Sequence, residues 1–144
     1  MRIETDSDYY YAVLNILERL REEVRLKYGS LAKGSKKLGK SCAYLNKIDI
    51  IGSVRNLDEI CRILDIDFDY LIERKENLGH YRNKELSFKK LISIYKKNAY
   101  AFRKSNSMKA IASGIYKGRQ NMKIATLLQW ADLFRLSPTE LIFE

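Results

Sequence analysis

Apolar residues recur at helical spacing in four stretches of the chain, and no stretch alternates with period two for long enough to predict a strand. Spacings of three and four residues gather apolar side chains on one face of a helix. A single proline and seven glycines interrupt the pattern, so the chain favours an all-α fold. The apolar positions are Tyr10, Val13, Leu14, Leu17, Leu20 and Val24; Leu57, Ile60, Cys61 and Leu64; Phe88, Leu91, Ile92 and Tyr95; and Ile124, Leu127, Leu128, Ala131 and Leu133.

The ends of the two halves of the chain resemble each other at a shift of about 70 residues. The segment LDEICRILDIDFDYLIE, from residue 57, aligns with LLQWADLFRLSPTELIFE, from residue 127. Each predicts a helix that ends near Asp65 or Arg135, then a turn, then a short helix capped by Asp67 or Ser137. Pro138 falls at the first position of the last helix, where its missing amide costs nothing. The repeat predicts two related units.

These units give three predicted regions: a first bundle over residues 1–73, a linker over 74–86 and a second bundle over 87–144. The first bundle opens with a long helix from Tyr9 to Tyr28. The linker is polar and charged, as in a loosely packed connection. Tyr9, Tyr10 and Tyr11 could stack on bases or on a partner, but an amphipathic helix favours their packing across the interface between the repeats.

Each half also has the residues of a helix-turn-helix upstream of its repeated end. In the first half, Ser35 is a small residue at a helix crossing, Gly39 suits a left-handed turn, and Ser41 caps a second helix. Leu45 and Ile48 form the apolar pair that faces inward. The predicted second helix therefore spans Ser41–Ile48.

The second half has a matching series from Asn98 onward. Asn106 can adopt the left-handed turn, Ser107 caps the next helix, and Ile111 and Ile115 face inward. Gly118 closes this helix, which is predicted over Ser107–Lys117. Both halves thus predict a short helix pair followed by the repeated helices.

Both halves resemble the Cro and lambda-repressor type of helix-turn-helix domain, over Ser30–Ile72 and Lys97–Ile142. Gly34 stands where that family usually has leucine. The resemblance implies two tandem five-helix bundles that form a pseudo-dimer and regulate transcription, most simply as a repressor. The residues that match the core and glycine positions of the family in the second half are Ile115, Gly118, Leu127, Ala131 and Leu141.

The charge distribution agrees with that implication. The net charge is +9, and neither Ser30–Lys47 nor Leu86–Lys123 contains an acidic residue. A cationic surface binds a phosphate backbone because it releases counterions. Double-stranded DNA is therefore the predicted partner.

In such domains the second helix of the motif lies in the major groove. Asn46 is the only side chain of these helices suited to bidentate contact with adenine, while lysines could reach guanine. Basic residues beside the helices would bind phosphates. The base-reading candidates are Cys42, Tyr44, Asn46, Lys47, Lys109, Ala110, Ser113 and Lys117, and the phosphate-binding candidates are Lys36, Lys37, Lys40, Lys96, Lys97, Arg103, Lys104, Arg119 and Lys123.

Other classes of function have less support. One histidine and two distant cysteines do not form a usual zinc site, and catalytic or phosphate-cradling motifs are missing, so we expect no enzyme, metal or cofactor. No apolar run spans a bilayer and no signal peptide opens the chain, which predicts a cytoplasmic protein without membrane contact. A protein-interaction module, such as an antitoxin or anti-repressor, is the main alternative, and RNA binding a third. Dimerisation through the N-terminal helix also stays open.

Overall fold

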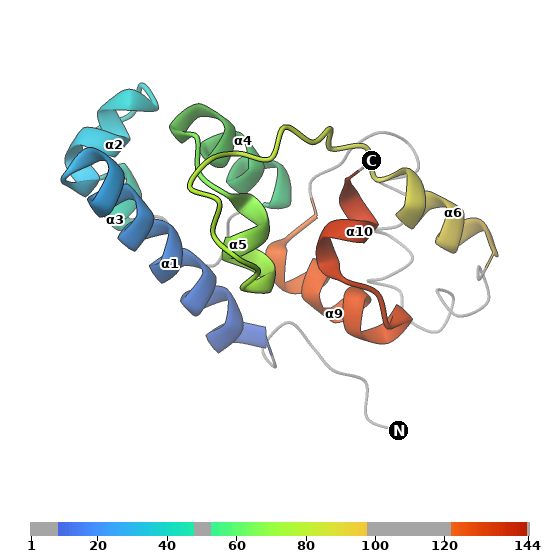
Figure 1. Ribbon diagram of the computed structural model, residues 1–144. Helices are drawn as coiled ribbons and strands as arrows, with labels where there is room; N and C mark the ends of the chain where they lie inside the picture. The colour runs from blue at the N-terminus through green and yellow to red at the C-terminus, as the bar shows by residue number, and fades with distance from the viewer. Residues whose placement is uncertain (1–8, 48–52, 98–121, 144) are drawn as a thin grey trace.

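The computed structural model describes residues 9–47, 53–97 and 122–143 (Figure 1). Within these ranges the chain is helical, and its only β pairing consists of isolated bridges. The all-α prediction is therefore confirmed for the described part of the chain. The helices are α1 (Tyr10–Tyr28), α2 (Leu31–Lys37), α3 (Tyr44–Lys47), α4 (Val54–Leu64), α5 (Phe68–Glu73), α6 (Lys89–Lys97), α9 (Ile124–Phe134) and α10 (Pro138–Ile142).

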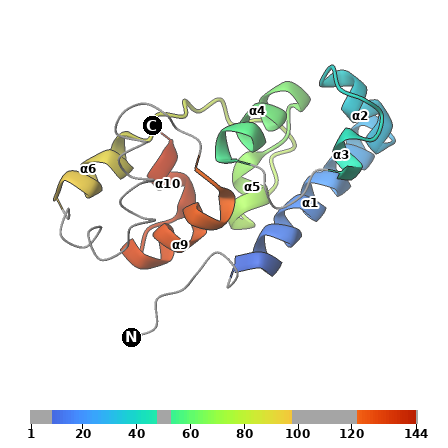
Figure 2. The same cartoon turned by 180° about the vertical axis from the view of Figure 1, so that it is seen from behind.

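The helices follow one another across an elongated molecule. Helices α2 and α3 pack at the C-terminal end of α1, at one extremity, and α6 lies at the other (Figures 1 and 2). Helices α4 and α5 occupy the middle, with α9 and α10 beside them. Contacts between α5 and α10, and between α1 and α9, join the first half of the chain to the second.

Helix α1 forms because one face of it is continuously apolar. Val13, Leu17, Leu20 and Val24 are buried, as the sequence predicts. Tyr10 and Leu14 of the predicted set are exposed and partly buried, respectively, and Ile16 is buried although the prediction omits it. The helix ends at Gly29, whose φ of 88° is left-handed and whose amide donates to the Arg25 carbonyl at 2.9 Å. The buried residues of α1 are Val13, Ile16, Leu17, Leu20 and Val24.

The repeated helix pairs have matching ends. Helices α4 and α9 both have 11 residues, and they end at Asp65 and Arg135, each left-handed with φ 56°. Asp67 then caps α5, where it accepts a hydrogen bond from the Tyr70 amide at 3.4 Å. Pro138 occupies the first turn of α10. These four sequence predictions are confirmed, whereas Ser137 is at the N-cap of α10 but makes no capping bond with its side chain.

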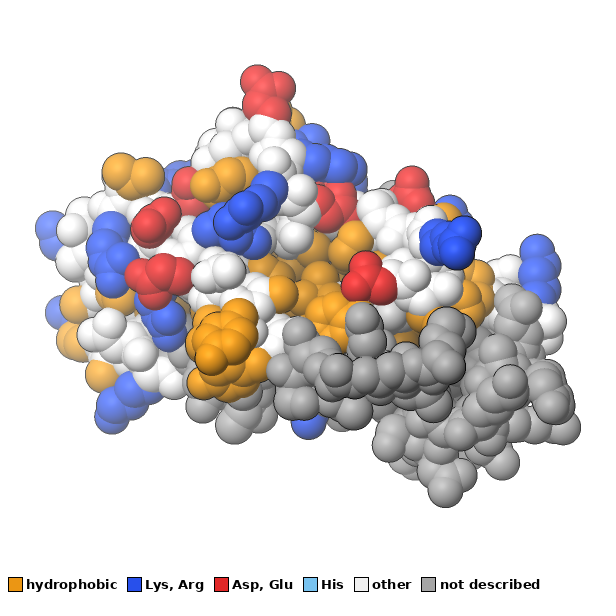
Figure 3. Space-filling view, turned by 90° about the horizontal axis from the view of Figure 1, so that it is seen from below, with side chains coloured by type: hydrophobic (Ala, Val, Ile, Leu, Met, Phe, Trp, Pro, Cys, Tyr) orange, Lys and Arg blue, Asp and Glu red, His pale blue; other side chains and the backbone are white. Residues whose placement is uncertain are grey.

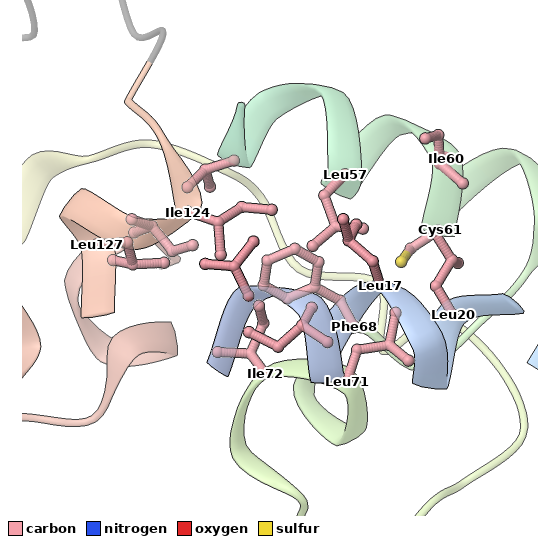
Figure 4. Close-up of a cluster of buried hydrophobic side chains, with 14 of the residues drawn as sticks. Leu17, Leu20, Leu57, Ile60, Cys61, Phe68, Leu71, Ile72, Ile124 and Leu127 are labelled. Atoms are coloured by element: carbon pink, nitrogen blue, oxygen red, sulfur yellow. The ribbon is translucent and has the colours of Figure 1, made fainter. Parts of the chain in front are cut away.

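A hydrophobic cluster runs through both halves of the molecule. Leu17 and Leu20 of α1 face Phe68 and Leu71 of α5, and Ile124 of α9 extends the cluster toward the second half (Figure 4). Leucine or phenylalanine side chains buried to this extent each contribute about 1.5–3 kcal/mol to stability. The two halves of the chain therefore share a hydrophobic core.

The three adjacent tyrosines separate at the start of α1. Tyr9 is 8% exposed, and its hydroxyl donates to Asp132 of α9 at 2.9 Å. Tyr10 and Tyr11 are 42% and 77% exposed, with their rings edge to face at 5.3 Å. Packing across the repeat interface is confirmed for Tyr9 and wrong for the other two, because the turn of α1 directs them to solvent.

The segment between the halves is held against α4 and α5. The Tyr81 hydroxyl donates to Asp58, the Arg82 guanidinium binds Asp67, and the Lys84 ammonium binds Asp69. The three carboxylates are almost fully buried. We call these six residues the linker clamp. The prediction of a loosely packed connection is wrong for residues 81–84, because polar side chains find buried partners far away in the sequence.

Candidate nucleic-acid interface

Helix α2 is capped by a serine at its start and packs closely against α1. The Ser30 hydroxyl accepts a hydrogen bond from the Lys33 amide at 3.2 Å, which caps α2. A Cβ added to Gly34 would lie 2.3 Å from Cγ1 of Val24 and 3.2 Å from Cδ1 of Leu45. A side chain larger than that of glycine at position 34 would therefore require Val24 to move.

Ser35 links the two helices of the motif. Its side chain is fully buried, and its hydroxyl donates to the Leu31 carbonyl at 2.8 Å and accepts from the Leu45 amide at 3.1 Å. The crossing therefore has a small residue, as predicted, and this residue also satisfies a buried amide of α3. Leu45 is fully buried, as the sequence analysis expects of the inward pair; its predicted partner Ile48 lies outside the described residues.

The turn after α2 has the glycine-dependent geometry that the sequence predicts. Gly39 is left-handed with φ 75°, its amide donates to the Lys36 carbonyl at 2.9 Å, and the Lys40 amide donates to the Ser35 carbonyl at 3.0 Å. This pair of bonds is a Schellman motif, in which a left-handed residue satisfies the last carbonyls of a helix. The turn fixes the direction in which the chain enters α3.

The prediction that the second helix begins at Ser41 is wrong. Residues 42 and 43 form a turn, and α3 begins at Tyr44 and is described to Lys47. A helix that began at Ser41 would bond the Leu45 amide to the Ser41 carbonyl, but that amide bonds to the Ser35 hydroxyl instead. The tertiary bond to α2 thus replaces the first turn of the predicted helix.

Basic side chains cover the outside of this helix pair. We call Lys36, Lys37, Lys40, Asn46 and Lys47 the α2–α3 basic surface; all five are exposed. Among the described residues, no ion pair involves any of its four lysines. The charge is therefore available to an anionic partner, and a carboxylate-free segment surrounds it.

Cys42 and Tyr44, two of the predicted base-reading residues, differ in how far their side chains are available to bind DNA. Cys42 is exposed in the turn. The ring of Tyr44 lies under the Lys40 ammonium, 5.6 Å from it, and the Tyr44 hydroxyl accepts from the side-chain amide of Asn56 at 3.4 Å. Tyr44 is thus engaged within the protein and joins α3 to the start of α4, which leaves Asn46 and Lys47 as the freer side chains of α3.

The second predicted surface is only partly within the described residues. Lys96 and Lys97 are exposed at the end of α6, on the far side of the molecule from α2 and α3 (Figures 1 and 2). Lys123 is exposed at the start of α9. The structure therefore does not bring these three lysines together. The candidates that lie outside the described residues are Arg103, Lys104, Lys109, Ala110, Ser113, Lys117 and Arg119.

Backbone and side-chain contacts connect equivalent places in the two halves. Ser53 and Lys123, which precede α4 and α9, form an antiparallel bridge, and the Val54 amide donates to the Met122 carbonyl at 2.8 Å. A second connection joins α5 to α10, where the Glu73 carboxylate accepts from the Thr139 amide and hydroxyl at 2.8 and 2.6 Å. Elements seventy residues apart therefore pair with each other.

Two tyrosines that precede helices contact matching positions of α9 and α4. Tyr9, just before α1, reaches Asp132 of α9, and Tyr81, before α6, lies under the Arg62 guanidinium of α4 at 4.7 Å. Positions 62 and 132 correspond under the repeat. Tyr9 of the first half and Tyr81 of the linker thus contact matching positions of α9 and α4, which was not apparent from the sequence because the two tyrosines precede their helices by different distances.

The linker clamp also changes the acidity of its members. Burial alone would raise the pKa of Asp67, but hydrogen bonds from Arg82 and from the Leu78 and Tyr70 amides outweigh it and leave the pKa lowered. Burial and the neighbouring Asp58 carboxylate raise the pKa of Tyr81. Asp67 is therefore charged and hydrogen-bonded at neutral pH.

The surface shown in Figure 3 differs in character from the α2–α3 basic surface. Seen from below, the molecule has hydrophobic side chains across its centre, with basic and acidic side chains mixed around them (Figure 3). The large hydrophobic side chains that are exposed in the described residues are Tyr10, Tyr11, Leu26, Ile63, Leu78 and Leu133. The positive charge is therefore not spread evenly over the molecule.

The described part of the chain contains neither a candidate metal site nor a candidate membrane-spanning helix. Its histidine, cysteine and acidic residues form no group of three that could hold a metal ion. None of its helices combines the length and the apolar character that crossing a bilayer requires.

Comparisons of the chain with protein-family models, with curated proteins and with solved structures find no match. The helix-turn-helix family thus stays a prediction from the residues.

Proposed function

We propose that this chain binds double-stranded DNA through the α2–α3 basic surface and acts as a transcriptional regulator, most simply a repressor. The observation that carries the proposal is a helix pair with a built crossing, at Gly34 and Ser35, and four exposed lysines free of ion pairs among the described residues. Phosphate contacts by such lysines supply most of the sequence-independent affinity of a DNA-binding protein.

The second half of the proposal is that the chain is a covalent pseudo-dimer. Its support is the pairing of equivalent elements: the bridge between Ser53 and Lys123 and the packing of α5 on α10. The hydrogen bond from Tyr9 to Asp132 adds a further contact between the halves. A two-fold axis between such units would place their reading helices about one DNA turn apart, ~34 Å. The chain would then bind two half-sites without a second copy.

A protein-interaction module is the second candidate, and the geometry of α3 favours it. Tyr44 is held by Lys40 and Asn56, and Leu45 is fully buried. Asn46 and Lys47 are then the base-reading side chains left on α3, which is a small set for sequence discrimination. Such a motif could keep its bundle and bind another protein instead.

Fluorescence anisotropy of the full chain with a random-sequence duplex distinguishes the two candidates. We expect binding at about 50 mM salt and, if six to ten phosphates are neutralised, a loss of roughly a thousandfold or more by about 200 mM. A single-stranded RNA of equal length is the control for general polyanion binding. Absence of duplex binding at the lowest salt would contradict DNA binding and favour the protein-interaction module.

A further inference from the structure

A pocket of about 440 Å³ lies between α1 and the end of α5, apart from the α2–α3 basic surface. The two helices pack against each other (Figures 1 and 2). Small-molecule sites in proteins usually have volumes of about 300–1,000 Å³, so the pocket is large enough for a small ligand. Its lining residues are Asn15, Glu18, Arg19, Glu22, Tyr70 and Arg74.

The two sides of the pocket are set by helical spacing. Asn15, Arg19 and Glu22 follow one another at intervals of four and three positions, which places them on one face of α1. On the other side, the Arg74 amide donates to the Tyr70 carbonyl at 3.0 Å, at the left-handed residue that ends α5. Two packed helices therefore hold these side chains around one space.

Two guanidinium groups line this space. Nε and Nη2 of Arg19 donate to the Leu71 carbonyl at 3.1 and 2.6 Å, which fixes the group and leaves Nη1 without a bond to any described residue. The Arg74 side chain is exposed and has no hydrogen bond or ion pair within the described ranges. Burial and the neighbouring Arg74 guanidinium lower the pKa of Arg19. An anionic group bound by both arginines would relieve this repulsion and satisfy their donors.

Carboxylates on the α1 side restrict the kind of anion that fits. Glu18 is already paired with Arg21 and Arg25, at 3.3 and 3.6 Å. Glu22 is exposed and forms no ion pair with the described part of the chain. The two glutamates of the lining balance the formal charge of its two arginines. A purely anionic ligand would therefore meet a like charge at Glu22, whereas a ligand with separate positive and negative groups meets an opposite charge for each.

We propose that this pocket binds a small zwitterionic amino acid. The ligand carboxylate accepts hydrogen bonds from Arg19 Nη1 and from the Arg74 guanidinium, and the ligand ammonium binds Glu22. The Tyr70 hydroxyl and the Asn15 amide, which have no partner among the described side chains, are available to the remaining polar groups of the ligand. The inference goes beyond DNA binding, because it adds a ligand site that does not use the α2–α3 basic surface.

Saturation-transfer difference NMR of the full chain, with the standard L-amino acids at millimolar concentration, tests for binding. We expect a signal from at least one of them, whose affinity is then measured by isothermal titration calorimetry. Arg74→Gln and Glu22→Gln should each weaken that affinity about tenfold or more, because each removes a charge-assisted hydrogen bond. Absence of a signal from every amino acid would overturn the proposal.

The analogue of the bound amino acid that lacks the amino group tests the contact with Glu22. The wild type should bind this carboxylate about tenfold more weakly than the amino acid, since it has no ammonium for Glu22. Glu22→Gln should bind the two compounds equally. If the wild type binds both compounds equally, or binds inorganic phosphate more tightly than the amino acid, the ligand is not a zwitterion and the proposal is wrong.

Arg55→Gln and Glu59→Gln are the matched controls, because both residues are exposed on α4 and neither lines the pocket. They should bind the amino acid as the wild type does, and circular dichroism with urea unfolding verifies that every variant is folded. Equal losses of affinity in Arg55→Gln and Arg74→Gln would count against the site. The titrations contain no DNA, so their failure leaves the proposed function standing, and failure of duplex binding leaves the pocket standing.

Discussion

The α2–α3 basic surface and the linker clamp use the same charged residue types in opposite ways. In the clamp, Arg82 and Lys84 bind carboxylates that are almost fully buried, Asp67 and Asp69. On the α2–α3 basic surface, the lysines are exposed and no carboxylate of the described residues pairs with them. Cations in the clamp therefore contribute to stability, whereas cations on α2 and α3 are available for binding.

The difference between paired and unpaired cations shows that net charge alone does not locate a binding surface. Arg62, Arg82 and Lys84 are compensated by the acids they touch, so they add little to the external field. Lys36 and Lys37 contribute fully because nothing in the described structure neutralises them. Substitutions in the two regions should therefore affect different measurements: unfolding for the clamp, and binding for the helix pair.

The largest loss of stability is expected for Asp67→Ala. Asp67 is fully buried, caps α5, accepts the Leu78 amide and binds Arg82 through both oxygens. Its removal leaves these donors without a partner, which costs about 3 kcal/mol or more of unfolding free energy. Urea unfolding followed by circular dichroism measures it. Glu59→Ala on the exposed face of α4 is the control, within about 0.5 kcal/mol of the wild type; an equal effect of the two would contradict the clamp.

Gly34→Ala tests the close contact that supports the α2–α3 basic surface. In an ordinary helix this change stabilises by about 1 kcal/mol. Here the new Cβ meets Val24, a stiff and fully buried side chain, so we expect a net loss of about 2 kcal/mol. The second change Val24→Ala should make Gly34→Ala less costly in that background. A gain of stability in the single variant, by thermal or urea unfolding, would show that α1 and α2 are not so closely packed.

Acid should weaken the clamp and leave the lysines charged. Hydrogen bonds lower the pKa of Asp67 despite its burial, and bonds from Thr139 and Lys75 likewise lower that of Glu73. Because the native pKa values are lowered, the unfolded state binds protons at a higher pH than the folded state does. The contribution of these carboxylates to the unfolding free energy is therefore complete above the ordinary pKa values of 3.8 and 4.5. It is lost as the pH falls through the lowered pKa values of the folded state. Urea midpoints measured from about pH 7 to pH 3 should decline, and less steeply in Asp67→Asn.

Thr139→Val makes a smaller change, at the connection between the halves. It removes the hydroxyl that donates to Glu73 at 2.6 Å but keeps the amide that donates at 2.8 Å. Loss of one hydrogen bond to a buried charged group predicts a decrease of about 1.5 kcal/mol in unfolding free energy. Thr139→Ser retains the hydroxyl and should retain most of the stability. If the serine and valine variants unfold at the same urea concentration, the bond does not join the halves energetically.

Local chemistry in the sequence predicted much of this fold. The helix ends near Asp65 and Arg135, the cap at Asp67 and the turn at Gly39 follow from preferences of neighbouring residues, and the structure has all of them. Periodicity likewise placed the buried face of α1. Such features depend on few residues close together in the chain.

Features that depend on distant partners were missed. Tyr81 and Arg82 lie in a polar segment without periodicity, so nothing in the sequence showed that buried carboxylates would hold them. The late start of α3 follows from the bond between Ser35 and the Leu45 amide, which crosses two helices.

The most direct test of whether the α2–α3 basic surface serves binding rather than stability uses one variant, Lys36→Gln/Lys37→Gln. Both its DNA affinity and its unfolding free energy are measured. We predict that its urea midpoint equals that of the wild type and that its salt slope for a random-sequence duplex falls by about 1.8, two phosphate contacts. Arg25→Gln/Arg74→Gln removes the same charge elsewhere and should keep the wild-type slope. An unchanged slope in the lysine variant would contradict the assignment of the α2–α3 basic surface to DNA.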